Sequence, residues 1–140
     1  MSVPERAKAG GGCQCGAARY ELHGAPLRVW ICHCTECRKQ SASAFGISVT
    51  VRREQLRPLR GEVAKWSRDC DSGRRLDCFF CPICGSRLWH EQAGATTLNV
   101  KGGSLDDPID VASATHIWTA RKLEGVVIPE NAERFAYEPS

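Results

Sequence analysis

The chain has 140 residues, enough for one domain, and its hydrophobic (42%) and charged (25%) fractions are ordinary for a globular protein. Its net charge of +3 is small and its basic residues are scattered, which argues against a nucleic-acid partner. No apolar run approaches the roughly 20 residues of a membrane helix, so we expect no membrane partner either.

Nine cysteines are the distinctive feature of the composition. The polar segment 1–12 has no apolar signal core, which favours a cytoplasmic protein in a reducing compartment. Clustered cysteines in such a compartment bind metal more often than they form disulfides. We therefore interpret most of the nine as metal ligands.

The pattern along the chain predicts a flexible N-terminus over 1–10 and a single domain over 11–140. One helical turn is expected at 35–40, with Thr35 as its N-cap, and a short turn or helix at 53–56. Alternating or β-branched residues predict the strands, at 17–22, 27–31, 41–51, 62–68, 74–80, 86–91, 96–101 and 113–118. Because helix signals are scarce, the predicted class is mainly β, with small antiparallel sheets.

Two short turns predict a closed metal site of four sulfurs. Cys13 and Cys15 form a Cys-x-Cys pair, and Cys81 and Cys84 form a Cys-x-x-Cys pair, each pair followed by a glycine. Four cysteines are a complete ligand set for structural zinc, and such a site contributes its binding energy to folding. The alternative is a set of buried free cysteines in a small core.

A third group, Cys32, Cys34 and Cys37, places three thiols within six residues. Three protein ligands with one open position are typical of catalytic zinc, and an incoming thiol would suit such a thiolate-rich ion. The alternative is that Cys70, Cys78 or a histidine completes the site and makes it structural. We expect Cys78 to be a buried thiol and Cys70 to be a loop thiol.

The three cysteine motifs together resemble a known family. Cys-x-Cys-Gly at 13–16, Cys-His-Cys-x-x-Cys-Arg-Lys at 32–39 with Ser-Ala-Ser-Ala-Phe at 41–45, and Phe-Cys-Pro-x-Cys-Gly at 80–85 are similar to the glutathione-dependent formaldehyde-activating enzyme family. That family includes the centromere protein V-like proteins. The likeness covers roughly 11–137.

The resemblance implies a β-tent fold with two zinc ions per chain. It assigns the structural zinc to Cys13, Cys15, Cys81 and Cys84, and the catalytic zinc to Cys32, Cys34 and Cys37. It also implies a carbon–sulfur lyase that adds glutathione, or a similar thiol, to formaldehyde or another small aldehyde, or cleaves the adduct.

Three further residues are candidate substrate contacts in the enzyme that the resemblance implies, namely His33, Arg38 and Ser41. Two other functions stay open at this point. One is a zinc-stabilised interaction module without catalysis, and the other is a thiol redox or metal-handling protein that uses the group at 32–37. The substrate and the oligomeric state do not follow from the sequence.

Overall fold

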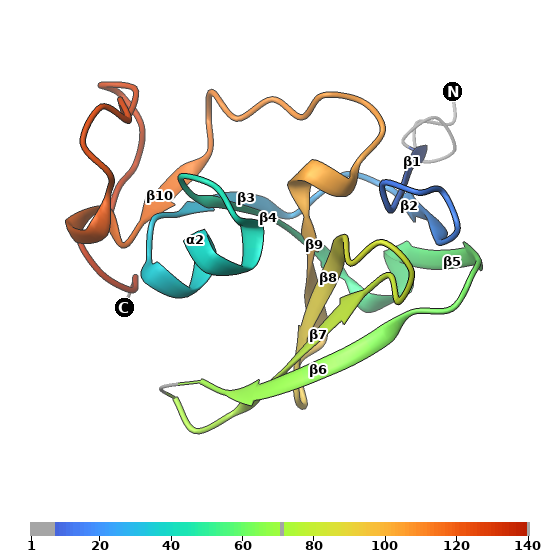
Figure 1. The fold of residues 1–140 in the computed structure, drawn as a ribbon. Coiled ribbons are helices and arrows are strands. Elements are labelled where there is room, and N and C mark those ends of the chain that lie inside the picture. Colours follow the sequence, from blue (N-terminus) through green and yellow to red (C-terminus); the bar gives the residue numbers. More distant parts are fainter. Residues whose placement is uncertain (1–7, 71, 140) are drawn as a thin grey trace.

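The structure is a computed structural model that describes residues 8–70 and 72–139 (Figure 1). The described strands form two β-sheets, and the other regular elements are one short α-helix and three 3-10 turns. The prediction of a mainly β protein is therefore confirmed. The larger sheet has seven strands and one parallel pair, so it is not the small antiparallel sheet that we expected.

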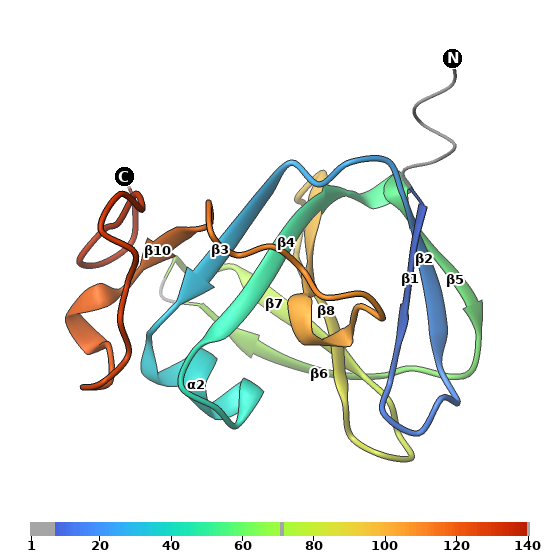
Figure 2. The ribbon, with the colours of Figure 1, turned by 90° about the horizontal axis from the view of Figure 1, so that it is seen from above.

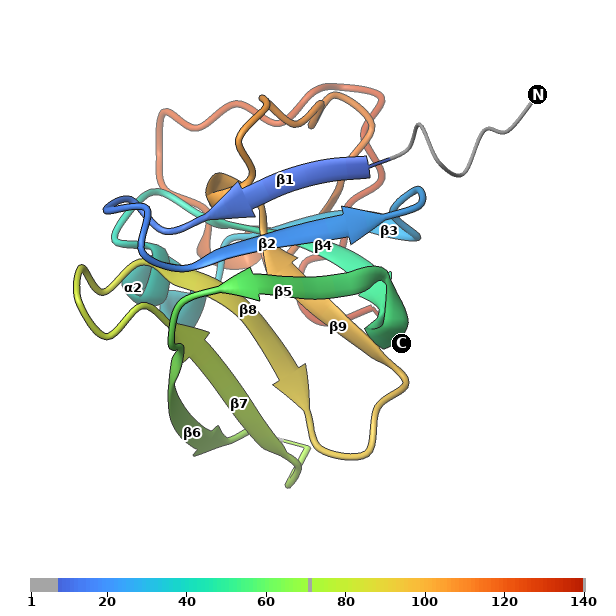
Figure 3. The same ribbon diagram turned by 90° about the vertical axis from the view of Figure 1, so that its right-hand side faces the viewer.

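The small sheet is antiparallel, in the order β1 (Lys8–Gly12), β2 (Arg19–His23) and β5 (Leu56–Arg60). Figure 3 shows it crossing in front of the larger sheet. β1 begins at Lys8, within the segment 1–10 that was expected to be flexible, and 1–7 lie outside the described residues.

The large sheet has the order β10-β3-β4-β9-β8-β7-β6 and curves from β3 and β4 round to β6 (Figures 1 and 2). Only the β10–β3 pair is parallel among the pairs described. The strands are β3 (Arg28–Cys32), β4 (Gly46–Arg52), β6 (Ala64–Asp69), β7 (Arg75–Phe80), β8 (Arg87–Gln92), β9 (Thr97–Lys101) and β10 (Thr115–Ile117).

The segment from Thr35 to Arg52 differs from the prediction in its N-cap and in the start of its strand. It forms the helix α2 (Thr35–Ser41), a turn, and then β4, which begins five residues later than the strand expected over 41–51. The N-cap is Cys34, and Thr35 is the first helical residue, because the Cys34 sulfur accepts a hydrogen bond from the backbone N–H of Cys37 (3.3 Å). The 3-10 turns are η1 (Arg53–Gln55), η2 (Gly102–Ser104) and η3 (Thr119–Arg121).

The two faces of the large sheet have different chemistry. One face packs on the small sheet, where Val49, Val51 and Val100 join Tyr20 and Leu22 in one buried apolar cluster. Successive side chains on a strand point to opposite faces, so the residues between these valines point the other way. That second face forms most of a cavity, whose lining includes Ser48, Thr50, Asn99 and Lys101.

Candidate metal centres and active-site cavity

The structure brings Cys13, Cys15, Cys81 and Cys84 together, with all four sulfur atoms within 4.8 Å of one another. The Cys13–Cys15 sulfur distance is 3.6 Å and the Cys15–Cys81 distance is 3.8 Å. Zinc–sulfur bonds of about 2.3 Å in a tetrahedron require sulfurs about 3.8 Å apart. The residues therefore fit a metal of this kind, and we call them the four-cysteine cluster.

Backbone groups support the sulfurs of this cluster. The N–H of Ala18 donates to Cys13 Sγ (3.2 Å), and the N–H of Ile83 donates to Cys81 Sγ (3.3 Å). Gly16 and Gly85 both have a φ of 83°, as expected of the glycine that follows each pair. Such donors favour thiolates, the form of cysteine that binds a metal.

The structure also brings Cys32, Cys34 and Cys37 together, within the same 4.8 Å limit. We call them the three-cysteine cluster. Cys32 ends β3, and the other two lie at the start of α2, so the strand-to-helix turn supplies the whole set. Among the described residues, no fourth cysteine, histidine or carboxylate joins this cluster.

The three sulfurs do not share their protons equally. The pKa of Cys34 is well below its usual range, because the thiols of Cys32 and Cys37 lie within hydrogen-bonding distance of its sulfur and nearby backbone N–H groups donate to it. The neighbouring sulfurs and burial raise the pKa of Cys32. Cys34 is therefore the sulfur most readily held as a thiolate.

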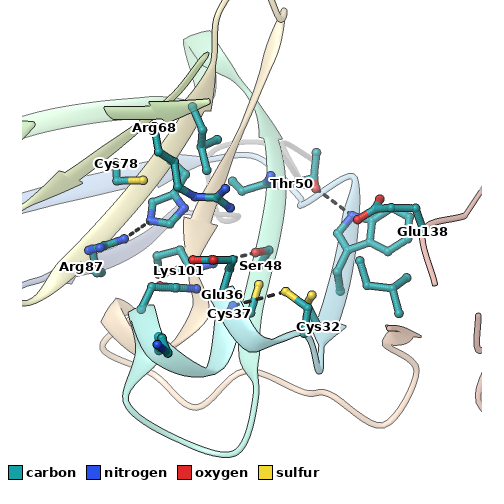
Figure 4. A pocket seen from close by; sticks show the side chains of 18 of the residues that line it. Cys32, Glu36, Cys37, Ser48, Thr50, Arg68, Cys78, Arg87, Lys101 and Glu138 are labelled. Atoms are coloured by element: carbon teal, nitrogen blue, oxygen red, sulfur yellow. Dashed lines mark hydrogen bonds between the residues drawn. The ribbon is translucent and has the colours of Figure 1, made fainter. Parts of the chain in front are cut away.

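The three-cysteine cluster lies at the edge of a cavity of about 740 Å³ on the second face of the large sheet. Figure 4 shows Cys32 and Cys37 on one side of this cavity and Arg68, Cys78 and Arg87 on the other. The apolar part of the lining includes two tryptophans, Trp30 and Trp66. We call this space the main cavity.

Two buried basic groups line the main cavity. Lys101 is 7% exposed and its Nζ donates to Ser48 Oγ (2.9 Å), while burial lowers its pKa from the usual value. His90 is also 7% exposed, and its pKa falls to about 2 because of burial and the nearby cations. Arg87 donates to His90 Nε2 (3.0 Å), so this imidazole is neutral with its proton on Nδ1.

The three residues proposed as substrate contacts lie outside the lining of the main cavity. His33 is fully buried. Arg38 donates to the backbone oxygen of Arg121 (3.0 Å), and Ser41 donates to the backbone oxygen of Cys37 (2.7 Å). Ser41 lines a second cavity, of about 670 Å³. That any of the three contacts a substrate stays a prediction.

His33 packs against a second buried histidine. A 2.9 Å hydrogen bond joins His33 Nε2 to His116 Nδ1, and the two rings stack with centroids 5.2 Å apart. Burial lowers the pKa of His33 to about 4 and also lowers that of His116. His33, which lies between two cysteines of the three-cysteine cluster, therefore links the strand-to-helix turn to His116 on β10.

The two cysteines outside the clusters differ in position. Cys78 is 1% exposed, as predicted for a buried thiol, and lines the main cavity. Cys70 follows β6 in a partly exposed turn.

The sequence did not reveal His90, Arg87 and Lys101 as cavity residues. Alternation could not find them, because Arg87 and His90 are three residues apart in β8. Their position required the strand order, which places β9 beside β4 and β8 beside β9.

Residues 8–121 match the family model described as glutathione-dependent formaldehyde-activating enzyme. The chain belongs to this family. The resemblance drawn from the cysteine motifs is thus confirmed, and both cysteine clusters of this formaldehyde-activating family member lie within the matched residues.

No curated protein matches the chain. Among solved structures, the crystal structure of a Rhodobacter sphaeroides protein, a structural genomics target, is similar, with a TM-score of 0.55 and 21% identity. The match covers 90% of this chain and 98% of that one, and it shows that the fold is shared. No helix among the described residues is long and apolar enough to cross a membrane.

Proposed function

We propose that this protein is a zinc-dependent enzyme of the carbon–sulfur lyase type. It adds a thiol, glutathione or a similar one, to a small aldehyde or cleaves the adduct. The observation that carries the proposal is the three-cysteine cluster, a ligand set with no fourth member among the described residues, at the edge of a large cavity. Family membership supports the same reaction class.

The donor set fits a zinc ion that keeps one position for a substrate. Cys32, Cys34 and Cys37 would hold it, and the ion would supply Lewis acidity that lowers the pKa of a bound thiol. The four-cysteine cluster would hold a second zinc with a closed ligand set, whose role is structural.

The protein's own groups would bind and orient the two reactants. In the forward direction the sulfur forms a bond to the carbonyl carbon, the π electron pair moves to the oxygen, and the oxygen ends as a hydroxyl. The cavity that faces the cysteines carries the unpaired cations Arg68, Arg87 and Lys101, none of which forms an ion pair among those described. Such a positive wall favours an anionic thiol, and glutathione carries carboxylates.

The test is a glutathione titration of protein loaded with Co²⁺, whose thiolate charge-transfer absorption reports directly on the sulfurs around it. We expect two metal ions per chain and, when glutathione binds, a stronger absorption that corresponds to one thiolate added to the seven of the two clusters. The exchange of formaldehyde with glutathione, followed by NMR, should be faster with the zinc protein than without it.

A matched control is Cys70→Ser, because Cys70 belongs to neither cluster and does not line the main cavity. This variant should retain both metal ions and the glutathione response. Two metal ions that ignore glutathione would contradict the proposal and favour a zinc-stabilised interaction module instead. Metal loss with disulfide formation within the three-cysteine cluster under mild oxidant would favour a redox protein.

A further inference from the structure

The main cavity and the second cavity share three lining side chains, those of Gln40, Arg87 and Lys101. These polar groups therefore form the partition between the two spaces. The partition lies next to the three-cysteine cluster, because Gln40 follows Cys37 by three residues on the same helix and so lies on the same face.

The Gln40 side chain has buried hydrogen-bonding groups that nothing in the described structure satisfies. Both its amide nitrogen and its amide oxygen are inaccessible to solvent and without a partner among the described residues. Buried polar groups in native proteins are nearly always paired, and the exceptions call for a specific explanation. A ligand group in the adjoining cavity is one such partner.

The place of this amide is fixed by Gly46, the first residue of β4. A Cβ atom at Gly46 would lie 3.0 Å from Gln40 Nε2 and 3.2 Å from the Cβ of Cys37. The absence of a side chain at Gly46 therefore lets the amide sit directly beside a cysteine of the cluster.

Lys101 approaches the same region from β9. Its Nζ bonds to Ser48, two residues after Gly46, so Gly46 and Ser48 face the same side of β4, about 7 Å apart. Figure 4 shows Lys101 and Ser48 beside Cys37. An ammonium group has three N–H donors, and the described structure accounts for one of them.

We propose that the Gln40 amide and the Lys101 ammonium form a binding site for the oxygen atom of the carbonyl substrate. The proposal rests on the proposed function and adds the residues that act on the second reactant. As the sulfur bonds to the carbonyl carbon, the π pair becomes negative charge on the oxygen. Fixed N–H donors aimed at that oxygen stabilise the charge.

The net reaction balances within these groups. The proton that the thiol loses is matched by the one that the oxygen gains, which leaves a neutral hydroxyl on the adduct. Gln40 Oε1 can then accept a hydrogen bond from this hydroxyl, since an amide both donates and accepts. A site of this kind suits a small oxygen-bearing carbon group in either direction of the reaction.

The experiment uses formate, a planar one-carbon oxygen ligand, as the probe. Zinc-loaded wild-type protein and the variants Gln40→Leu and Lys101→Met are titrated with ¹³C-formate and followed by NMR. Lys65→Met is the charge control, because Lys65 is exposed on β6 and lines neither cavity. We expect formate to bind about tenfold more weakly to Gln40→Leu and Lys101→Met, with Lys65→Met unchanged.

Thermal unfolding of the same proteins separates this role from a structural one. Gln40→Leu replaces an unpaired amide with an apolar group of similar size, so its melting temperature should stay equal or rise while formate affinity falls. Equal formate affinity in all four proteins, or no binding to the wild type, would overturn the proposal. So would a loss of stability in Gln40→Leu that accounts for the weaker binding.

A parallel titration with 1-propanethiol distinguishes this proposal from the proposed function. This thiol carries no oxygen, so its binding to the three-cysteine cluster should be unchanged in Gln40→Leu. A wild-type protein that ignores propanethiol but shows the expected formate pattern would contradict the proposed function and support the oxygen site. A protein that binds propanethiol, but whose variants bind formate as tightly as the wild type, would support the proposed function and contradict the oxygen site.

Discussion

The four-cysteine and three-cysteine clusters offer the same type of ligand atom, a cysteine sulfur, but they are built from different parts of the chain. The four-cysteine cluster joins two turns separated by 66 residues and lies against the buried apolar cluster through Cys13 and Cys81. The three-cysteine cluster comes from one strand-to-helix turn and opens on the main cavity. A metal in the first therefore connects distant parts of the fold, whereas a metal in the second connects almost nothing that is not already adjacent.

Cys81→Ser should have the largest effect, because it removes a ligand from the cluster that joins the two turns. Structural zinc contributes about 10–16 kcal/mol in zinc-finger peptides, as much as the whole stability of a typical domain. We expect the variant to lose its native circular dichroism at 25 °C. A folded variant with one bound zinc would contradict the proposal that the four-cysteine cluster is structural and the three-cysteine cluster is not.

Cys34→Ser should leave the fold intact and reduce the zinc content from two ions per chain to one. Serine is a good N-cap, so its hydroxyl can accept the hydrogen bond that Cys37 N–H gives to the Cys34 sulfur. When free zinc is present at about 100 times the Kd of the site, loss of the bound zinc ion lowers the free energy of unfolding by about 2.7 kcal/mol. Metal analysis and thermal unfolding measure both quantities, and unfolding as complete as that of Cys81→Ser would contradict the expectation.

His90, which lines the main cavity, predicts that the protein is less stable in acid. The pKa of His90 is about 2 in the folded protein and about 6.5 when unfolded, so the unfolded chain binds more protons below pH 6.5. Stability should therefore fall as the pH falls below 6.5, by about 1.4 kcal/mol from this residue at pH 5.5.

The variant His90→Gln isolates this contribution, because protonation of the cysteines is common to both proteins. Urea unfolding at pH 7.5 and pH 5.5 should show a smaller loss in the variant, by about 1.4 kcal/mol. Equal losses in the two proteins would mean that the imidazole titrates normally in the fold.

Ala42→Gly should have the smallest effect and leave both clusters unchanged. Ala42 ends α2 with φ 52° and ψ 42°, a left-handed conformation that glycine adopts without strain. We expect the free energy of unfolding to rise by about 0.5–1 kcal/mol, with two zinc ions per chain. Ala44→Gly is the control, since Ala44 has no positive φ among the described backbone angles and should gain nothing.

The members of the two cysteine clusters could be predicted because each turn that supplies them is local in the sequence. Two such turns together make the four-cysteine cluster, and one makes the three-cysteine cluster. The strands β6 and β7 could be predicted because a turn signal separates two short runs, and β9 could be predicted because Leu98 and Val100 alternate with polar residues. The N-terminal strand could not, since Lys8–Gly12 contains three glycines and reads as flexible. The structure shows why glycine is needed there: a Cβ at Gly11 would lie 2.4 Å from the Tyr20 ring.

Two other features required the tertiary structure. β5 contains Pro58, which argues against a strand, but β5 is an edge strand and so tolerates the missing N–H donor. The main cavity depends on the order in which strands pair. Ser48 and Lys101 are 53 residues apart in the chain, and only the β4–β9 pairing makes them neighbours.

The separation of the two halves of the four-cysteine cluster has a consequence during synthesis. A ribosome that adds 5–20 residues each second takes roughly 3 to 13 s to travel the 66 residues from Cys15 to Cys81. During that interval the first turn has no partner, whereas the three-cysteine turn is complete 22 residues after Cys15, after roughly 1 to 4 s. The nascent chain therefore completes the proposed catalytic ligand set before the proposed structural one.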